Sequence, residues 1–425
     1  MTTLLLRLTN AFRKRNIHSF TQTMIRLYLS VIISLLCVVS FAQKKEIAQA
    51  RDNVKSGKNL EQVEKSMLSL LADSANRGNE KIYRLLNSAV QKQYVQQNEK
   101  MYLKQSVDSA QFFLTLNRAF KYAFLTDSVF PNERKHNEPF LSKYLPNLSA
   151  GGNYLFQKEK YSEAYDLFDT YISCKKHPMF AGKREIVNRM KPSAFRALCC
   201  GYHLNDYAKT VKHKRQALLY KPGNMVTLKY LAETYQKSDS TYRKYVEMLD
   251  SGFVKYPCEE YFFTRLLNFT MSHRDYEKGL ALTEKAIGEC PEHLLYHYAK
   301  SHILLSMERY EDCIKAADET LALSDSIANT YYIAGIANVY LAEQLKDKSV
   351  KDKETKSQME KFYAAALPYL EKYRERKPDR KDKWGSPLYN IYLNLNKGKE
   401  FDEIDKLLRN VDPTPAKAKQ KSKKR

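Results

Sequence analysis

Residues that break helices are scarce in this sequence: its 425 residues include only 13 glycines and 13 prolines. An all-β protein of this length needs many tight turns, and such turns depend on the backbone conformations that glycine and proline favour. The scarcity therefore argues against an all-β fold. Apolar residues make up 43% of the chain, which is enough for a packed core and argues against global disorder. Long stretches with helical apolar spacing indicate an all-α protein.

Motifs of common catalytic sites are also missing. The sequence has no glycine-rich phosphate loop, no GxSxG nucleophile elbow and no HExxH zinc motif. An enzyme needs convergent groups in a site that excludes water. We therefore predict that the chain is not an enzyme and uses no cofactor. A hydrolase with an unrecognised site is the remote alternative.

The amino-terminal region reads as an export signal. An uncharged apolar block spans Leu27–Ala42 and follows Arg26 and the basic cluster at 13–15. The block is shorter than the roughly 20 residues that a membrane-spanning helix needs, and it ends in Ser40-Phe41-Ala42, which suits cleavage before Gln43. We predict a signal peptide over residues 1–42, with Met24 as an alternative start, and a periplasmic location. An uncleaved signal that anchors the chain in the membrane is the alternative.

The chain is strongly basic. Its formal charge is +23, and residues 1–42 hold five basic and no acidic residues, so the exported part carries +18. In an exported protein this charge points away from nucleic acid and towards anionic envelope surfaces. The densest cluster is Ala416–Arg425, after Pro413 and Pro415. We predict a basic disordered tail over 411–425, for which peripheral contact with an anionic envelope surface is the alternative to a purely solubilising role.

Six cysteines follow the predicted cleavage point, and none forms a CxxC pair. An oxidising compartment permits disulfides, but the spacing does not resemble a disulfide framework. We expect most of them to be small apolar fillers between helices, and the sequence does not decide whether any are paired. They are Cys174, Cys199, Cys200, Cys258, Cys290 and Cys313.

Internal repetition is the most informative pattern. Helical runs end at Pro222, Pro257, Pro291 and Asp325, which are 35, 34 and 34 residues apart. A period near 34 indicates a helix–turn–helix unit that cannot bury its apolar face alone and must stack on its neighbours. The sequence therefore predicts an array of stacked helix pairs.

Within each period, small and aromatic residues recur at matching positions. Small residues allow two helices to cross closely, and large ones fill the neighbouring gap. The marker residues are Gly152, Tyr161, Ala164 and Phe168; Tyr276, Gly279 and Ala286; Tyr310, Cys313 and Ala317; and Gly335, Ala366, Leu370 and Tyr373. This pattern resembles the tetratricopeptide-repeat (TPR) family, and the resemblance implies a right-handed α–α superhelix.

Several positions depart from the TPR pattern. Leu198 and Leu267 stand where the family favours a small residue, and Lys244 stands where it favours alanine. The unit at 192–222 has two extra residues between Ala208 and Ala217, and Glu343–Gln358 interrupts the sixth unit. Segments such as DSANRGNEKIY and FDTYISCKKHP further resemble uncharacterised exported TPR proteins of Gram-negative bacteria, which implies a periplasmic location and no particular activity.

The resemblance divides the chain into segments. The TPR array is predicted over 145–378, followed by a closing pair of helices over 379–410. The region 43–144 is helical without clear repeat marks, and we expect further helix pairs that cap the amino end. Its role cannot be read from the sequence, and neither can the oligomeric state, the partner or the pathway.

One set of residues could hold a metal ion. His293 and His297 are four positions apart, so both imidazoles can share one helix face near Cys290 and His302. Pro291, however, separates Cys290 from the histidines, and His302 lies five positions further on. We interpret these histidines as structural and predict no metal site.

The function is predicted from the first helix of each unit, which lines the inner groove of a TPR superhelix. Aromatic and amide side chains on a rigid wall suit an extended peptide. We therefore predict a scaffold or adaptor that binds a protein or peptide partner in the cell envelope through its concave groove. Binding of acidic envelope glycans or lipid head groups is the alternative. A Lys–Asn clamp for a peptide carboxylate is absent. The groove candidates are Asn153, Lys229, Glu233, Tyr261, Asn268, Tyr298, His302, Asn329 and Tyr332.

Overall fold

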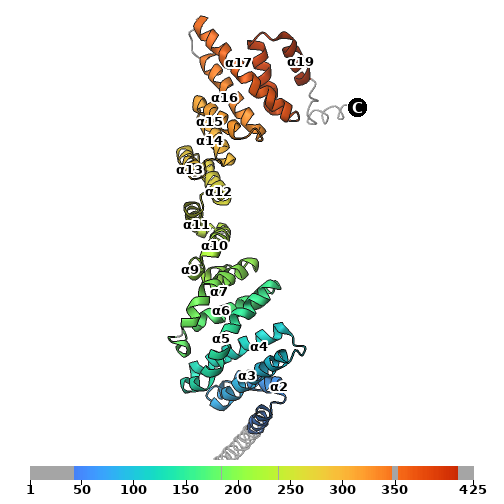
Figure 1. Ribbon diagram of the computed structural model, residues 1–425, viewed down its shortest axis with the longest axis vertical. Coiled ribbons are helices and arrows are strands. Elements are labelled where there is room, and N and C mark those ends of the chain that lie inside the picture. The colour runs from blue at the N-terminus through green and yellow to red at the C-terminus, as the bar shows by residue number, and fades with distance from the viewer. Residues whose placement is uncertain (1–42, 183, 238, 347–352, 410–425) are drawn as a thin grey trace, which may run out of the picture. The chain divides into compact units, whose positions relative to one another are not determined.

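A computed structural model describes residues 43–182, 184–237, 239–346 and 353–409 (Figure 1). The predicted signal peptide and basic tail lie outside these residues. Every regular element that the structure describes is a helix, so the predicted all-α fold of stacked helix pairs is confirmed. None of the described helices combines the length and the apolar character needed to cross a membrane.

The chain divides into two compact units, with the boundary in the sequence between Thr227 and Leu228. The first unit begins with a helix over 43–56, followed by α2 (Leu60–Ala72), α3 (Glu80–Tyr102), α4 (Ser109–Val129), α5 (Arg134–Gln157), α6 (Tyr161–Cys174), α7 (Arg184–His203), α8 (Tyr207–Lys212) and α9 (Lys214–Ala217). Short 3-10 turns occur at Ser74–Asn76, Pro131–Glu133, Pro178–Phe180 and Lys221–Gly223. The region 43–144 therefore consists of helices that pack on their chain neighbours.

The second unit continues the same scheme. Its helices are α10 (Asn224–Gln236, whose first turn belongs to the first unit), α11 (Tyr242–Lys255), α12 (Glu260–Ser272), α13 (Tyr276–Glu289), α14 (Leu294–Ser306), α15 (Tyr310–Leu323), α16 (Ala328–Lys346), α17 (Lys353–Arg376), α18 (Lys381–Asn394) and α19 (Gly398–Arg409), with a 3-10 turn at Asp239–Thr241. From α11 to α19, consecutive helices pack on each other, and α14, α16 and α18 also touch in turn.

The 34-residue period is visible in the helix positions. The helices α12, α14 and α16 begin at residues 260, 294 and 328, and α11, α13 and α15 begin at 242, 276 and 310. Pro257, Pro291 and Asp325, at which the sequence predicts the ends of helical runs, each lie two residues beyond the end of a helix. The repeat read from the sequence is therefore a repeat of helix hairpins.

The turns inside several hairpins share one backbone conformation. The second residue after α5, α7, α12, α14 and α18 has a positive φ between 53° and 59°, and the next helix begins two residues later. A residue in this left-handed region stops a helix and satisfies its last carbonyl groups. These residues are Glu159, Asn205, Arg274, Glu308 and Asn396.

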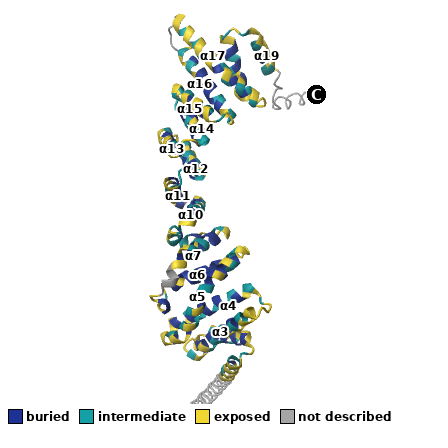
Figure 2. Ribbon diagram, viewed as in Figure 1, coloured by how far each residue is buried: buried dark blue, intermediate teal, exposed yellow. Residues whose placement is uncertain are grey.

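Burial follows the helix faces that meet inside each unit (Figure 2). At Gly152 of α5, an added Cβ would lie 2.6 Å from the Phe168 ring of α6. Glycine there allows α5 and α6 to approach, and the ring fills the gap that the missing side chain leaves. The small and aromatic positions noted in the sequence thus pack against each other.

Two departures from the TPR pattern have a structural outcome. The two extra residues after Ala208 coincide with a break in the second helix of that hairpin, which is split at His213 into α8 and α9. The imidazole Nε2 of His213 lies 2.6 Å from Asp169 Oδ1 of α6. The segment 343–358, predicted to interrupt the sixth unit, is helical in its described parts. The helix α16 continues to Lys346, and α17 begins at Lys353, after residues 347–352.

Candidate functional site

The nine groove candidates lie on the first helices of their hairpins. Asn153 is exposed on α5 of the first unit, and the other eight lie on α10, α12, α14 and α16 of the second. Asn268 and Asn329 are exposed. The other six candidates of the second unit form two clusters, one around Tyr261 and one around Tyr332.

In the first cluster, Tyr261 of α12 lies between two cationic groups. The Arg265 guanidinium lies 3.7 Å from the centre of its ring, and the Lys229 ammonium of α10 lies 5.2 Å from it. Lys229 also forms a 2.9 Å ion pair with Glu259. Burial and the nearby Glu233 carboxylate raise the pKa of the Tyr261 hydroxyl. The cations and carboxylates largely neutralise each other, so this cluster connects α10 to α12 and offers little free charge.

In the second cluster, α14, α16 and α18 present aromatic and basic groups together. Tyr332 of α16 packs on the buried Tyr373, with the ring centres 5.3 Å apart, and the Lys383 ammonium of α18 lies 5.3 Å above the Tyr332 ring. Tyr298 and His302 of α14 have ring centres 6.4 Å apart. We call Tyr298, His302, Tyr332 and Lys383 the aromatic–basic face. Sequence reasoning missed Lys383, because it lies in the closing pair of helices.

Lys383 also acts on His302. The His302 side chain reaches the surface, but surrounding protein atoms partly desolvate it, and this desolvation and the positive charge of Lys383 lower the pKa of its imidazole. The protonated form is thus disfavoured in the folded chain. Lys383→Gln is expected to raise the pKa of His302, because one of the two causes of the depression is removed. An NMR titration of the histidine ring protons measures this value. Lys381→Gln, at an exposed position of the same helix, is the control, and equal shifts in both variants would contradict the assignment.

A cleft in the first unit contains the remaining candidate, Asn153. The cleft has a volume of about 380 Å³ and lies between α5 and α7, and Tyr220 also lines it. Its α5 wall carries Ser149 and Asn153, and its α7 wall carries Arg189 and Arg196. We call it the α5–α7 cleft. Sequence reasoning missed both arginines. Arg189 precedes the unit predicted at 192–222, and Arg196 lies inside that unit without a mark that sets it apart from other basic residues.

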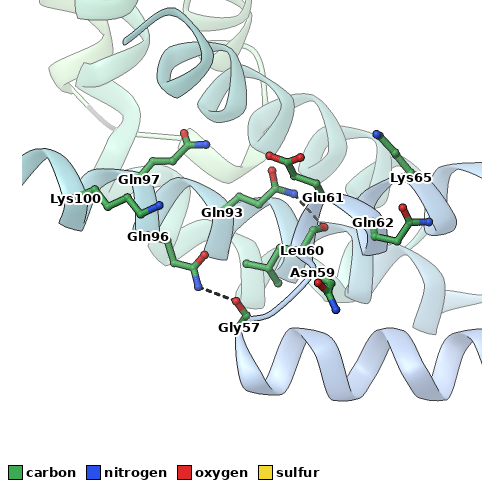
Figure 3. A pocket seen from close by; sticks show the side chains of 10 residues that line it. All are labelled: Gly57, Asn59, Leu60, Glu61, Gln62, Lys65, Gln93, Gln96, Gln97 and Lys100. Atoms are coloured by element: carbon green, nitrogen blue, oxygen red, sulfur yellow. Dashed lines mark hydrogen bonds between the residues drawn. The ribbon is translucent and has the colours of Figure 1, made fainter. Parts of the chain in front are cut away.

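A second cleft, of about 440 Å³, lies between α2 and α3 and is lined mainly by amide and charged groups (Figure 3). Gln96 donates to the Gly57 carbonyl at 2.9 Å, and Gln93 donates to the Leu60 carbonyl at 3.2 Å and to Glu64 at 2.9 Å. These bonds hold the turn before α2 against α3. Gln97 also lines the cleft, and its Oε1 is buried without a hydrogen-bond partner.

The two histidines considered as metal ligands contact other groups of the protein. The His293 ring stacks on Tyr296 at 4.0 Å and lies 3.4 Å from Glu260. The Nε2 atom of His297 lies 2.7 Å from the Pro291 carbonyl oxygen. Among the described residues, no group of histidine, cysteine and acidic side chains has an arrangement that could hold a metal ion.

The structure answers a question about the cysteines that the sequence left open. Cys174, Cys199, Cys200 and Cys313 are buried and unpaired, as fillers would be. Cys258 and Cys290, in contrast, form a disulfide with a Cα–Cα distance of 5.9 Å. The bond joins the two ends of the α12–α13 hairpin, which antiparallel packing brings together. In the sequence, Cys258 directly follows Pro257 and Cys290 directly precedes Pro291, at either end of one repeat, but this placement did not by itself assign the pair.

Comparisons with known proteins found similarity to solved structures alone. No protein-family model and no curated protein matches the chain. Solved structures that are similar include the C-terminal part of a TPR repeat-containing protein from Cytophaga hutchinsonii, at 18% identity and a TM-score of 0.40 over 63% of this chain and 96% of that one. The MamA protein is similar at 16% identity and a TM-score of 0.32, over 46% and 96%. A tetratricopeptide repeat protein from Parabacteroides merdae is similar at 14% identity and a TM-score of 0.25, over 65% and 93%.

Proposed function

We propose that this chain, whose helix hairpins are similar to those of TPR proteins, is a non-enzymatic scaffold that binds an extended segment of a partner protein. The observation that carries the proposal is the aromatic–basic face of the second unit. Three successive first helices, α14, α16 and α18, place Tyr298, His302, Tyr332 and Lys383 near one another on a packed framework.

The chemistry of this face suits a peptide. Tyrosine rings supply large contact area with few rotatable bonds, and their hydroxyls can bond to peptide amides. Tyr298 and Tyr332 are only partly buried against the core, so they are fixed in position and still reach solvent. Lys383 adds a positive charge that a carboxylate of the partner can meet.

We further propose that the scaffold acts in the periplasm, within the cell envelope. Two features support this location. The apolar block Leu27–Ala42 has the length and flanking charge of a cleaved export signal. The Cys258–Cys290 disulfide is of a kind that persists in oxidising compartments.

The test is a crosslinking pull-down from envelope fractions with wild-type protein and with the double variant Tyr298→Ala, Tyr332→Ala. Capture of the partner is expected to fall at least about tenfold, as for buried aromatic anchors of interfaces. Tyr102→Ala, at a tyrosine that is 88% exposed in the first unit, is the matched control. Circular dichroism confirms that the double variant keeps its helices. An unchanged partner list in a folded double variant would exclude the face.

A further inference from the structure

The α5–α7 cleft holds two arginines on one helix face. Arg189 and Arg196 are seven positions apart on α7, two turns of helix, so their Cα atoms are about 10 Å apart along the axis. Both line the cleft, together with Ser193 of the same helix. Two guanidinium groups thus follow one wall at a spacing that the helix determines.

Arg196 is supported by aromatic rings and not by a carboxylate. Its guanidinium lies 4.7 Å from the centre of the Phe156 ring and 5.9 Å from that of Phe195. Within the part of the chain that the structure describes, neither Arg196 nor Arg189 has an ion-pair partner. Stacking on an aromatic face orients a guanidinium group and leaves the N–H donors, which lie in the plane of the guanidinium, free to bond to a ligand. Arg196 is therefore a fixed cationic group without an anion.

The opposite wall adds neutral polar groups. Ser149 and Asn153 are four positions apart on α5, so they share one face towards the cleft. The buried Ser149 and Ser193 hydroxyls lie 3.2 Å apart and join the two walls by a hydrogen bond. Asn153 is exposed beside them, and its amide can both donate to and accept from a peptide backbone. Tyr220, whose ring centre lies 5.4 Å from that of Phe195, also lines the cleft.

We infer that the α5–α7 cleft binds an acidic segment of a partner protein, with one carboxylate on Arg196 and a second on Arg189. An extended segment in the polyproline II conformation has three residues per turn and rises about 3.1 Å per residue, so acidic side chains three positions apart lie on one face, about 9 Å apart, and match the spacing of the two arginines. The inference rests on the proposed role of the chain as a protein-binding scaffold. It deepens that role by naming the chemistry of a partner segment, and it uses a different unit from the aromatic–basic face.

The experiment measures fluorescence anisotropy of a labelled peptide with the full exported chain. The peptide is extended, has blocked termini and carries glutamates three positions apart; a second peptide carries glutamines instead. Wild-type protein is expected to bind the glutamate peptide at least about tenfold more tightly, since each charge-assisted bond is lost with glutamine. Arg196→Gln is expected to weaken binding by a similar factor, and Arg196→Lys by less, because lysine keeps the charge without the planar fork.

Arg215→Gln is the matched control, because it removes the same charge from an exposed position on α9 of the same unit. If it weakens binding as much as Arg196→Gln, attraction is diffuse and the inference is wrong. Equal binding of an acidic oligosaccharide of the same charge would also overturn it in favour of a glycan ligand. If Arg196→Gln loses helicity, Arg189→Gln replaces it in the test. The inference then requires that Arg189→Gln weakens peptide binding more than Arg215→Gln does. If wild-type protein does not bind the glutamate peptide while the partner pull-down still depends on Tyr298 and Tyr332, this inference is wrong and the proposed function stands.

Discussion

Replacing both Cys258 and Cys290 with serine is expected to lower the free energy of unfolding of the second unit by about 4 kcal/mol. The disulfide closes a loop between residues 32 positions apart, and in the chain-entropy model a loop of this length restricts the unfolded chain by that amount. In an array whose units are stabilised by their neighbours, weakening one hairpin also weakens those beside it.

The single tryptophan offers a direct readout. Trp384 is buried in α18 of the second unit, so its fluorescence follows unfolding of that unit in denaturant. Treatment of the wild-type protein with a thiol reductant should reproduce the loss, and the double variant should show no further loss on reduction. A denaturation midpoint that neither change moves would show that the bond contributes nothing to stability.

Gly201→Ala is expected to destabilise the first unit by about 3 kcal/mol. An added Cβ at this position of α7 would lie 2.4 Å from the backbone nitrogen of Thr210 and 2.7 Å from the carbonyl carbon of Lys209, both in α8. The groups that it meets are backbone atoms, which cannot rotate away as a flexible side chain can. The turn that joins the two helices leaves them no room to separate, so the overlap strains the packing.

Gly288→Ala provides the contrasting case. Gly288 is a helical glycine of α13 with nothing within 4 Å of an added Cβ, so alanine there should stabilise the chain by up to about 1 kcal/mol through its better helix propensity. Denaturation followed by circular dichroism compares the two variants. If both glycines tolerate alanine equally, the close approach of α7 and α8 is not as described.

The repeat was readable from the sequence because it has a local cause. Proline and glycine act on their own stretch of backbone, and the small and aromatic positions recur with the period of the hairpin. Pro257 and Pro291 therefore lie two residues beyond helices, and Gly152 lies where α5 meets α6. The reading was less detailed where these marks are missing, as in the region 43–144.

The candidate site was readable only in part. Assigning groove residues to the first helix of each hairpin placed Tyr298, His302 and Tyr332 on neighbouring helices. It missed Lys383, Arg189 and Arg196, because a residue that completes a site from another hairpin carries no mark in its own segment. Lys383 of α18 lies more than 50 positions after Tyr332 of α16 in the sequence, and only the folding of the chain brings the two side chains together.

By itself, the sequence determined that this protein is a helical array with a period of 34 residues, since helix formation and hairpin turns depend on residues close together in the chain. Only the tertiary structure decided which cysteines pair, which cation lies over Tyr332 and which arginine stacks on Phe156. Those contacts depend on how far each hairpin rotates and shifts against the next, and that packing is set by many side chains acting together.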